Sequence, residues 1–329
     1  MNFDYLKGKS VLVTGGTGTV GKFCVKQLLE NSEARRVIVF SRDEFKQLNM
    51  SIEFNEYKGR VRFFLGDIRD KNRLTRAFKG VDYVIHTAAL KHVNIIEYNP
   101  SEAIQTNIIG TQNVVDAAID QGVERLLLIS TDKSANPTSL YGATKLCAEK
   151  IVIGGNFYGS PRTKLSAVRF GNIFGSRGSF VELIKEQRKT GVVNLTHEEM
   201  SRFWITVLQT TNFVLESLGS MYGGEIFVPK IPSMTVKDFI KTCAPDSEIC
   251  VTGIRPGEKI HEILLTPEEA RHSLNFDDKF IILPENVEIL DSSVYPEGGN
   301  LEDDFIYASD KNDDWISSEQ LLELLDGDL

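Results

Sequence analysis

Tyr141 and Lys145 are two residues whose types and spacing could do chemistry in this chain of 329 residues. They stand four positions apart in a segment that reads as a helix after the loop broken by Pro137, so their side chains share one helix face. A neighbouring ammonium favours the phenolate and lowers the pKa of a tyrosine toward working pH. Such a pair is a base that can take a proton from an alcohol while a hydride leaves the same carbon.

Asp132 and Lys133 form a second pair of charged residues in the same stretch, "STDKSANPTSLYGATK". Adjacent groups of opposite sign normally ionise together, and their titrations are then coupled. On residue types alone, an ordinary ion pair is the favoured interpretation. The pair also follows the carboxyl end of the apolar run "RLLLIS", which is where ligands bind in parallel sheets, so a role in chemistry stays open.

A glycine-rich turn, "VTGGTGTVGK", places Gly15, Gly18 and Gly21 at G-x-x-G-x-x-G spacing between a strand-like and a helix-like run. In dinucleotide-binding folds the first glycine permits a tight turn, the second lets the backbone approach a pyrophosphate, and the third lets the helix pack on the sheet. The start of the helix then faces the anion. We therefore predict a dinucleotide site at this turn. Its other predicted contacts are Thr17, Thr19 and Val20.

The tip of the second predicted strand is where such folds distinguish NAD from NADP. An acidic residue there would favour NAD, whereas Ser41 and Arg42 occupy the tip in "VFSRDEFK". A guanidinium suits bidentate contact with a 2′-phosphate, so we predict NADP, with Asp43 keeping NAD as the alternative. The contacts predicted at this and the next two strand ends are Ser41, Arg42, Asp43, Lys46, Asp67, Ile68, Ala88 and Ala89.

Short apolar runs alternate with helix-like segments along the first half of the chain. Each run has the length and near-continuous apolar character of a strand buried on both faces, and the alternation implies a parallel sheet between two helical layers. We predict an α/β fold whose doubly wound Rossmann domain covers residues 1–170 and is rejoined by about residues 203–222. A smaller α/β substrate-binding region, richer in glycine and proline, is predicted over residues 171–202 and 223–329.

The composition excludes several classes of protein. Hydrophobic residues make up 41% and charged residues 25%, as in ordinary globular proteins. With 37 basic against 46 acidic residues, the net charge of −9 offers no footprint for nucleic acid or anionic lipid. The four cysteines lack metal-site spacing, and no stretch approaches the ~18 apolar residues of a membrane span. We expect a cytoplasmic protein without metal, membrane or nucleic-acid partner.

The chain resembles the extended short-chain dehydrogenase/reductases, and within them the soluble UDP-N-acetylglucosamine 4,6-dehydratases of the C5-inverting kind that start pseudaminic acid synthesis. The likeness covers essentially the whole chain. Retaining members commonly have methionine where this chain has Tyr141, so the inverting branch is favoured. The motifs that carry the resemblance are "VTGGTGTVGK", "SRDE", "AALKHV", "STDKSANPTSLYGATK", "RFGNIFGSRGS", "SRFWIT", "GGEIFVPKIPSM" and "IRPGEKIHE".

The resemblance implies a dehydration that uses bound NADP. Tyr141 would deprotonate the sugar 4-hydroxyl as hydride leaves C4, and the resulting ketone acidifies the C5 proton. Lys133 would remove that proton, and Asp132 would protonate the departing 6-hydroxyl before hydride returns to C6. Lys133 must then be neutral, which burial and the nearby positive charges of Lys145 and oxidised nicotinamide would promote, and Asp132 must hold a proton, which desolvation would promote. Thr131 is counted with these catalytic candidates.

The resemblance also implies a UDP-N-acetylglucosamine site. Arg202 and Arg255 match the family's diphosphate and nucleotide contacts, for which arginine has suitable geometry. Glu258 would accept a hydrogen bond from a ribose hydroxyl, and Lys91 would reach both cofactor and substrate. The other family-matched candidates are Asn172, Arg177 and Thr196. The family further implies a homo-oligomer, either a dimer or a hexamer built from dimers, and a downstream aminotransferase or reductase as a partner.

Four alternatives stay open on sequence. A dehydratase could retain the C5 configuration, or release the 5,6-unsaturated ketone to a partner reductase. A UDP-sugar 4-epimerase or reductase would share the glycine turn, Tyr141 and Lys145 but would not need Asp132 and Lys133. A non-catalytic NADP-sensing regulator on the same fold would need neither pair.

Overall fold

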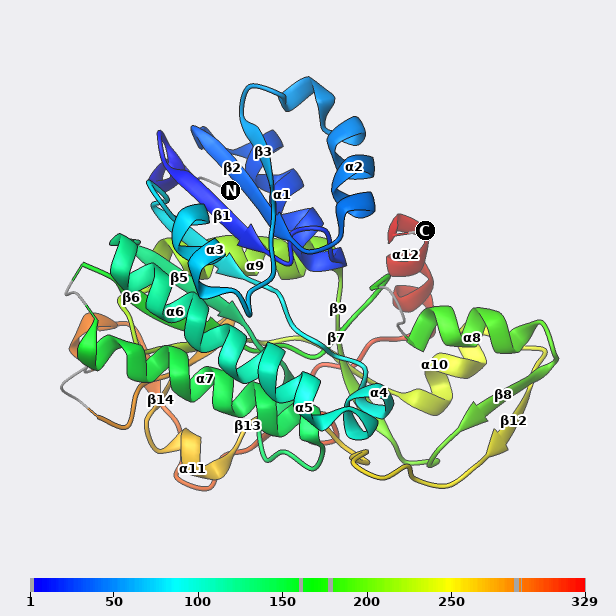
Figure 1. Cartoon of the computed structure of the whole chain (residues 1–329). Helices are drawn as coiled ribbons and strands as arrows, with labels where there is room; N and C mark the ends of the chain where they lie inside the picture. Colours follow the sequence, from blue (N-terminus) through cyan, green and yellow to red (C-terminus); the bar gives the residue numbers. More distant parts are fainter. Residues whose placement is uncertain (1–2, 160–161, 177–179, 287–289, 291, 329) are drawn as a thin grey trace.

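A large sheet with helices on both faces forms the body of the computed structural model (Figure 1). The structure describes residues 3–159, 162–176, 180–286, 290 and 292–328, and this part contains a ten-stranded sheet in the order β16-β14-β15-β10-β6-β5-β4-β1-β2-β3. The neighbours from β3 to β10 are all parallel, and the chain order reverses between β1 and β4. The predicted doubly wound fold is confirmed. The parallel strands are β1 (Ser10–Thr14), β2 (Arg36–Ser41), β3 (Val61–Leu65), β4 (Tyr83–His86), β5 (Arg125–Ile129), β6 (Lys164–Val168) and β10 (Ile226–Pro229).

The parallel strands are buried from both sides. In β1, Val11 and Val13 belong to one apolar core, and Leu12 belongs to the other, which explains the near-continuous apolar runs in the sequence. The first core includes residues of α1 (Thr19–Asn31) and α9 (Val207–Ser220). The second includes residues of α3 (Lys71–Ala77), α6 (Gly110–Gln121) and α7 (Leu140–Tyr158), which cover the front of the sheet in Figure 1.

The sheet continues past the domain boundary proposed from sequence. β10 pairs with β6, and the antiparallel strands β15 (Lys279–Ile282), β14 (Ser273–Asn275) and β16 (Gly299–Asn300) follow it in the same sheet. The prediction placed all of these in the substrate region, residues 223–329. The prolines that suggested a break stand at the last position of β10 and beyond it, where a missing N–H is tolerated.

A smaller lobe lies beside the sheet, at the right of Figure 1. There β8 (Val192–Leu195) pairs in parallel with β12 (Glu248–Val251), next to α8 (Phe180–Arg188) and α10 (Val236–Cys243). Its core contains a stack of three rings, with Trp204 centred 5.0 Å from Phe174 and 4.4 Å from Phe239. The C-terminal helix α12 (Ser318–Asp328) adds Leu321 and Leu325 to this core.

Short elements connect the two parts. β9 (Ser201–Ile205) lies between β7 (Asn172–Ile173) and β11 (Ser233–Thr235). None of the helices in the described ranges is long and apolar enough to span a membrane. The remaining elements are β13 (Ile263–Leu265), β17 (Tyr307–Ala308), α2 (Glu44–Glu53), α4 (Val93–Tyr98), α5 (Pro100–Ala103), α11 (Pro267–Ala270), the π-helical η3 (Ile104–Ile109) and the 3₁₀ turns η1 (Asp4–Leu6), η2 (Asn55–Tyr57), η4 (Asp132–Ser134) and η5 (Ser292–Val294).

Candidate active site

The glycine-rich turn between β1 and α1 is shaped for the close approach of an anion. Gly15 has a φ of +63°, and a Cβ there would lie 2.8 Å from the backbone of Ala88, so only glycine meets both conditions. A Cβ on Gly21 would collide with the carbonyl oxygen of Gly15. Gly18 is the N-cap of α1 and has no side chain to cover the helix start, where backbone N–H groups bind anions. The turn therefore fits a pyrophosphate.

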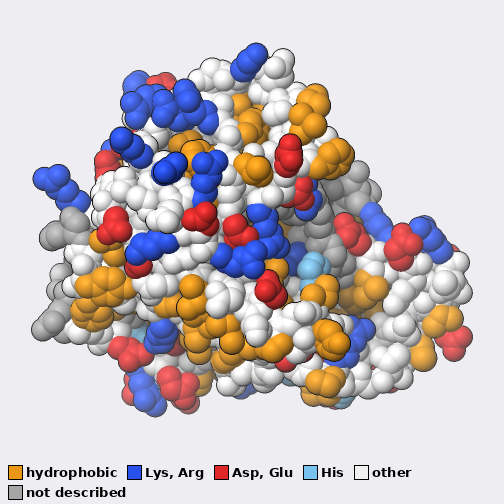
Figure 2. All heavy atoms as spheres, in the orientation of Figure 1, with side chains coloured by type: hydrophobic (Ala, Val, Ile, Leu, Met, Phe, Trp, Pro, Cys, Tyr) orange, Lys and Arg blue, Asp and Glu red, His pale blue; other side chains and the backbone are white. Residues whose placement is uncertain are grey.

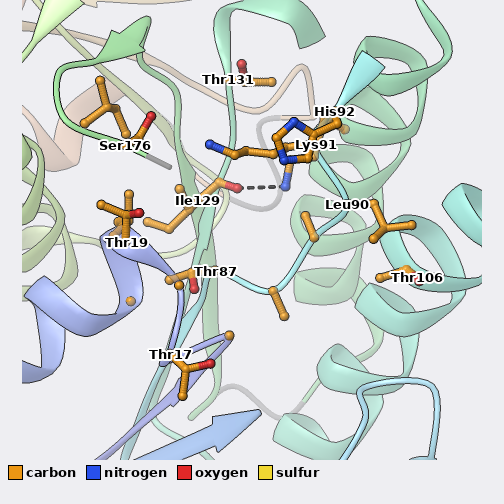
Figure 3. Close-up of a pocket in the computed structure, with 18 of the residues that line it drawn as sticks. Thr17, Thr19, Thr87, Leu90, Lys91, His92, Thr106, Ile129, Thr131 and Ser176 are labelled. Carbon is orange, nitrogen blue, oxygen red and sulfur yellow. Dashed lines mark hydrogen bonds between the residues drawn. The ribbon is translucent and has the colours of Figure 1, made fainter. Parts of the chain in front are cut away.

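A cavity of about 690 Å³ runs from this turn to the end of β5. Figure 3 shows Thr17 at one end, and Thr131, Lys91 and His92 at the other. The structure thus brings the predicted cofactor residues together from several strand ends and α7. The lining includes Gly15, Thr17, Gly18, Thr19, Val20, Gly21, Ser41, Arg42, Asp43, Lys46, Asp67, Ile68, Ala88, Ala89, Lys91, Tyr141 and Lys145, together with Thr131 and Lys133.

At the tip of β2, the acidic residue Asp43 and the basic residue Arg42 make different contacts. Asp43 is the N-cap of α2: its carboxylate accepts a hydrogen bond of 2.9 Å from the Lys46 backbone N–H and lies 3.0 Å from the Lys46 Nζ. These contacts lower the pKa of Asp43, chiefly through the backbone hydrogen bond. Arg42 is more than half exposed, and its Nη1 lies 3.8 Å from Asp67 Oδ2. The Asp43 carboxylate therefore caps α2, while the Arg42 guanidinium lies at the edge of the cavity.

Asp132 is buried directly behind the cavity, between the lining residues Thr131 and Lys133. It opens the η4 turn after β5 and is 0% exposed. Its Oδ1 accepts hydrogen bonds from Thr131 Oγ1 at 2.9 Å and Lys133 Nζ at 3.0 Å. Its Oδ2 has no hydrogen-bond partner among the described residues. The ion pair favoured from residue types is therefore present, and one carboxylate oxygen of Asp132 is unpartnered.

Lys133 contacts a second buried carboxylate that sequence reasoning missed. Glu262 Oε1 lies 3.4 Å from Lys133 Nζ, and the Glu262 side chain is only 3% exposed. Two further cations flank Glu262: Arg202 Nε is 3.8 Å from Oε1, and Lys259 Nζ is 3.7 Å from Oε2. The quoted motif "IRPGEKIHE" ends on Glu262, but local sequence gives no sign of its proximity to Lys133. The site therefore holds two carboxylates among three cations.

The charges in this cluster set the protonation of the predicted acid and base. Burial raises the pKa of Asp132, even though Lys133 opposes this, which agrees with the expected protonated acid. Burial disfavours the Lys133 ammonium, but the carboxylates of Asp132 and Glu262 outweigh burial and raise the pKa of Lys133. The expected neutralising effect of burial on Lys133 is present, but it is outweighed by Asp132 and by Glu262, the carboxylate that the sequence did not reveal.

Tyr141 and Lys145 are both placed on the cavity, but they do not act on each other as expected. Lys145 Nζ donates a 2.7 Å hydrogen bond to the Ile129 carbonyl oxygen, the dashed line in Figure 3, and burial lowers its pKa to about 8. Burial raises the pKa of Tyr141 to about 12, and Lys133 is the cation that opposes this rise. The predicted lowering of the Tyr141 pKa by Lys145 is wrong here, since burial dominates and the ammonium is held by β5.

A second cavity, of about 480 Å³, opens beside the first between the sheet and the smaller lobe. Lys91, Lys133 and Asn172 line both cavities, so the two meet at the predicted base. Arg177, another predicted substrate contact, lies outside the described residues. The predicted substrate residues that line the second cavity are Lys91, Asn172, Thr196, Arg202, Arg255 and Glu258.

Two of these residues are held by the protein in ways that the sequence did not predict. Arg202 is buried, and its Nη atoms donate to the carbonyl oxygens of Ser201, Lys259 and Ile260. Glu258 Oε2 accepts a hydrogen bond of 3.2 Å from the Arg255 backbone N–H. Arg202 thus anchors the 259–260 backbone under the cavity, whereas Arg255 is exposed at the cavity wall.

Comparisons with known proteins agree with this geometry. The family model described as "Polysaccharide biosynthesis protein" matches residues 11–284. A protein of Campylobacter jejuni subsp. jejuni serotype O:23/36 named UDP-N-acetylglucosamine 4,6-dehydratase (inverting) is 43% identical over 328 residues, which cover 97% of each chain. A UDP-glucose 4-epimerase of Rickettsia conorii is 35% identical over 299 residues, 88% of this chain and 87% of the other.

The fold also matches a solved structure. The X-ray structure of Pen from Bacillus thuringiensis superposes with a TM-score of 0.90 at 37% identity, covering 99% of this chain and 100% of that chain. The similarity therefore extends through both the sheet and the smaller lobe.

Proposed function

Because the chain belongs to the polysaccharide biosynthesis protein family, we propose that it is an NADP-dependent UDP-N-acetylglucosamine 4,6-dehydratase of the C5-inverting type. The observation that carries the proposal is the position of Lys133. It lines both cavities and contacts the buried carboxylate of Asp132 at 3.0 Å. The proposed base therefore stands where a cofactor in one cavity and a sugar in the other would meet, and the proposed acid is buried directly beside it.

The proposed roles are those that the family resemblance implies for the residues on the two cavities. The bound nicotinamide would supply the acceptor, and later the donor, of the hydride. Tyr141 takes the proton from the 4-hydroxyl as C4 is oxidised. Lys133 removes the C5 proton that the new ketone acidifies, and Asp132 gives its proton to the 6-hydroxyl, which leaves as water. Thr131 holds the Asp132 carboxyl through the 2.9 Å hydrogen bond.

The contact between Lys133 and Asp132 can supply both reactive forms. Transfer of one proton across the 3.0 Å hydrogen bond converts ammonium and carboxylate into neutral amine and carboxylic acid without any change in net charge. These are the forms that elimination requires. The ion-pair interpretation and the acid–base interpretation are then two proton positions of one coupled pair.

The cofactor proposal rests on the tip of β2. Asp43 is occupied as the cap of α2, and Arg42 stands at the cavity edge, so a positive rather than a negative group is available beside the ribose. That arrangement suits the 2′-phosphate of NADP. The other predicted cofactor residues would hold the pyrophosphate, adenine and ribose along the first cavity, and Arg255, Glu258, Asn172 and Thr196 would hold the nucleotide sugar in the second.

The wider setting is also a proposal. A keto-deoxy sugar made here would feed pseudaminic acid or another surface glycan in the cytoplasm, through an aminotransferase or a reductase. Hydrophobic side chains grouped over α7 in Figure 2, with Phe157 and Tyr158 more than half exposed, support a homo-oligomer.

A second candidate is a UDP-sugar 4-epimerase, since a relative at 35% identity carries that kind of name. An epimerase needs oxidation at C4 but no elimination. The Asp132 and Lys133 contact would then have no chemical use, which is why the dehydratase is preferred.

One experiment separates these functions. The protein with NADP is incubated with UDP-N-acetylglucosamine in deuterated water, and products are read by mass and proton spectra. We expect loss of water without external reductant, deuterium at C5 and inverted C5 configuration. An unchanged sugar, or one inverted only at C4, would overturn the proposal.

A further inference from the structure

The buried carboxylate of Glu262 has no role in the scheme above, although it lies beside the predicted base. Its Oε2 has no hydrogen-bond partner among the described residues, where Lys259 Nζ lies 3.7 Å from this oxygen. Its Oε1 lies 3.4 Å from Lys133 Nζ and 3.8 Å from Arg202 Nε. Burying a carboxylate with incomplete partners costs free energy. Its backbone N–H is already satisfied by Ser309 Oγ at 3.0 Å, so the acidic side chain is not needed for that contact.

The geometry distinguishes Glu262 from an ordinary structural ion pair. Arg202 satisfies most of its hydrogen-bonding capacity on backbone carbonyls, and Lys259 Nζ donates to the Ala135 carbonyl at 2.6 Å. Both cations therefore hold backbone near the cluster while leaving Glu262 only loosely paired. The charge that comes closest to Glu262 is Lys133, at 3.4 Å.

After the C5 proton has been removed, Lys133 is charged and Asp132 cannot act as its counter-ion. After the C5 proton has moved to Lys133, the lysine is an ammonium while Asp132 still carries the proton for the 6-hydroxyl. A neutral carboxylic acid cannot balance that ammonium. Among the described residues beside Lys133, Glu262 is the other carboxylate within 4.0 Å of its Nζ.

We infer that Glu262 is a positioning residue that stabilises the Lys133 ammonium between removal of the C5 proton and protonation of the 6-hydroxyl. The inference rests on the proposed dehydratase function and deepens it. No bond to Glu262 forms or breaks. The C5 proton moves to Lys133 and leaves an enolate on the sugar; the enolate electron pair then forms the C5=C6 bond as the C6–O bond breaks and a different proton moves from Asp132 to the leaving oxygen.

The inference has a signature in pH dependence. The groups that face the pair among the described residues are Glu262 and Lys259 from the loop before β13, Arg202 from β9, Tyr141 from α7 and Lys91 from the loop after β4. An anion raises the pKa of any acid or ammonium beside it, so its removal lowers the pKa values of both Asp132 and Lys133. Both limbs of the elimination rate profile should therefore move to lower pH when Glu262 loses its charge.

The test uses the full-length protein with NADP and UDP-N-acetylglucosamine. In Glu262→Gln we expect elimination, measured as water loss and C5 deuteration, to fall about 10- to 100-fold, because the ammonium formed at Lys133 loses a buried counter-charge. C4 oxidation, read as transient absorbance of reduced cofactor, should stay within about twofold, since Glu262 does not act on the hydride step. The matched control is Glu268→Gln, an exposed glutamate at the start of α11, which should match the wild type.

The outcomes are distinct. Loss of elimination with an acid-shifted profile and normal C4 oxidation supports the inference. A wild-type rate and profile, or an equal loss of both steps, would overturn it. If Glu262→Gln does not fold, Glu262→Asp should give a smaller loss and shift in the same direction, and an unchanged profile there would count against the inference. Failure of the proposed function can be told apart from failure of this inference, because the wild-type protein would then release no dehydrated sugar.

Discussion

Replacing Lys133 by methionine should separate oxidation from elimination. Methionine keeps the length of the side chain but cannot accept the C5 proton. Tyr141 and the first cavity remain, so C4 can still lose its hydride. We therefore expect reduced cofactor to accumulate in a single turnover while water loss falls by about 10²- to 10⁴-fold, the usual contribution of a positioned general base.

The structure also limits how much stability this change should cost. Leaving a buried charge without its partner typically costs about 3–5 kcal/mol. Here burial already raises the pKa of Asp132, so the carboxyl can take a proton, and Glu262 keeps Arg202 and Lys259 at 3.8 and 3.7 Å. The loss in the free energy of unfolding should therefore be about 1–3 kcal/mol, the typical cost of leaving a buried polar group unsatisfied. The free energy of unfolding in denaturant measures it.

The matched control is Lys150→Met, which changes the same residue type at an exposed position of α7, paired with Glu285 at 3.2 Å. It should leave both steps and the stability unchanged. Elimination by Lys133→Met within tenfold of the wild-type rate would show that another group removes the C5 proton. An equal loss of cofactor reduction and of elimination would refute the assignment of oxidation and C5 deprotonation to different residues.

Four further predictions test other parts of the site. Arg42→Ala should weaken NADP binding, measured by calorimetry, by about 1.5–3 kcal/mol and leave NAD binding unchanged. The control is Arg36→Ala, at the other end of β2. Equal losses of affinity for both cofactors would contradict the 2′-phosphate contact. Gly21→Ala should abolish dinucleotide binding, because the added Cβ meets the Gly15 carbonyl; near-normal affinity would exclude the close approach. Burial gives Lys145 a pKa of about 8, and Lys145 lines the cofactor cavity, so binding of the anionic dinucleotide should weaken between roughly pH 7 and 9 as this positive charge is lost. Lys145→Arg should remove that weakening; the same transition in the arginine variant would assign it elsewhere. Glu149→Gln should lower the free energy of unfolding by about 1–3 kcal/mol, since it breaks the buried 2.7 Å ion pair with Arg169 while Arg169 keeps Glu269 at 2.8 Å. A loss under about 1 kcal/mol would contradict this reasoning.

Local patterns were enough to predict the sheet and the cofactor cavity. The glycine spacing and the short apolar runs each act within a few residues, so the chain order alone brings Gly15, Ser41 and Asp67 to neighbouring strand ends. The extent of the sheet was harder, because β14 and β15 join it through pairings that no local pattern specifies.

The protonation of the site could not be predicted, because it depends on residues far apart in the chain. Lys133 is near Glu262 only because the segment before β13 folds back against η4, and this contact adds to the effect of Asp132 in raising the pKa of Lys133. The role of Asp43 was likewise open until the structure showed it capping α2. Charge type is visible in sequence, whereas the partner that sets a pKa is a property of the fold.

Hydrogen bonds to neighbouring elements fix the η4 turn on the side away from the cavities. Ser134 Oγ donates to Glu149 at 2.6 Å, and Asp132 N–H donates to the Phe170 carbonyl at 3.1 Å. Glu149 is in turn held by the buried guanidinium of Arg169. The backbone of the turn is thus tied to α7 and to the end of β6, while the Lys133 side chain reaches both cavities. A proton can then pass between Lys133 and Asp132 without movement of the turn, so the coupling with Glu262 depends on charge rather than on a conformational change.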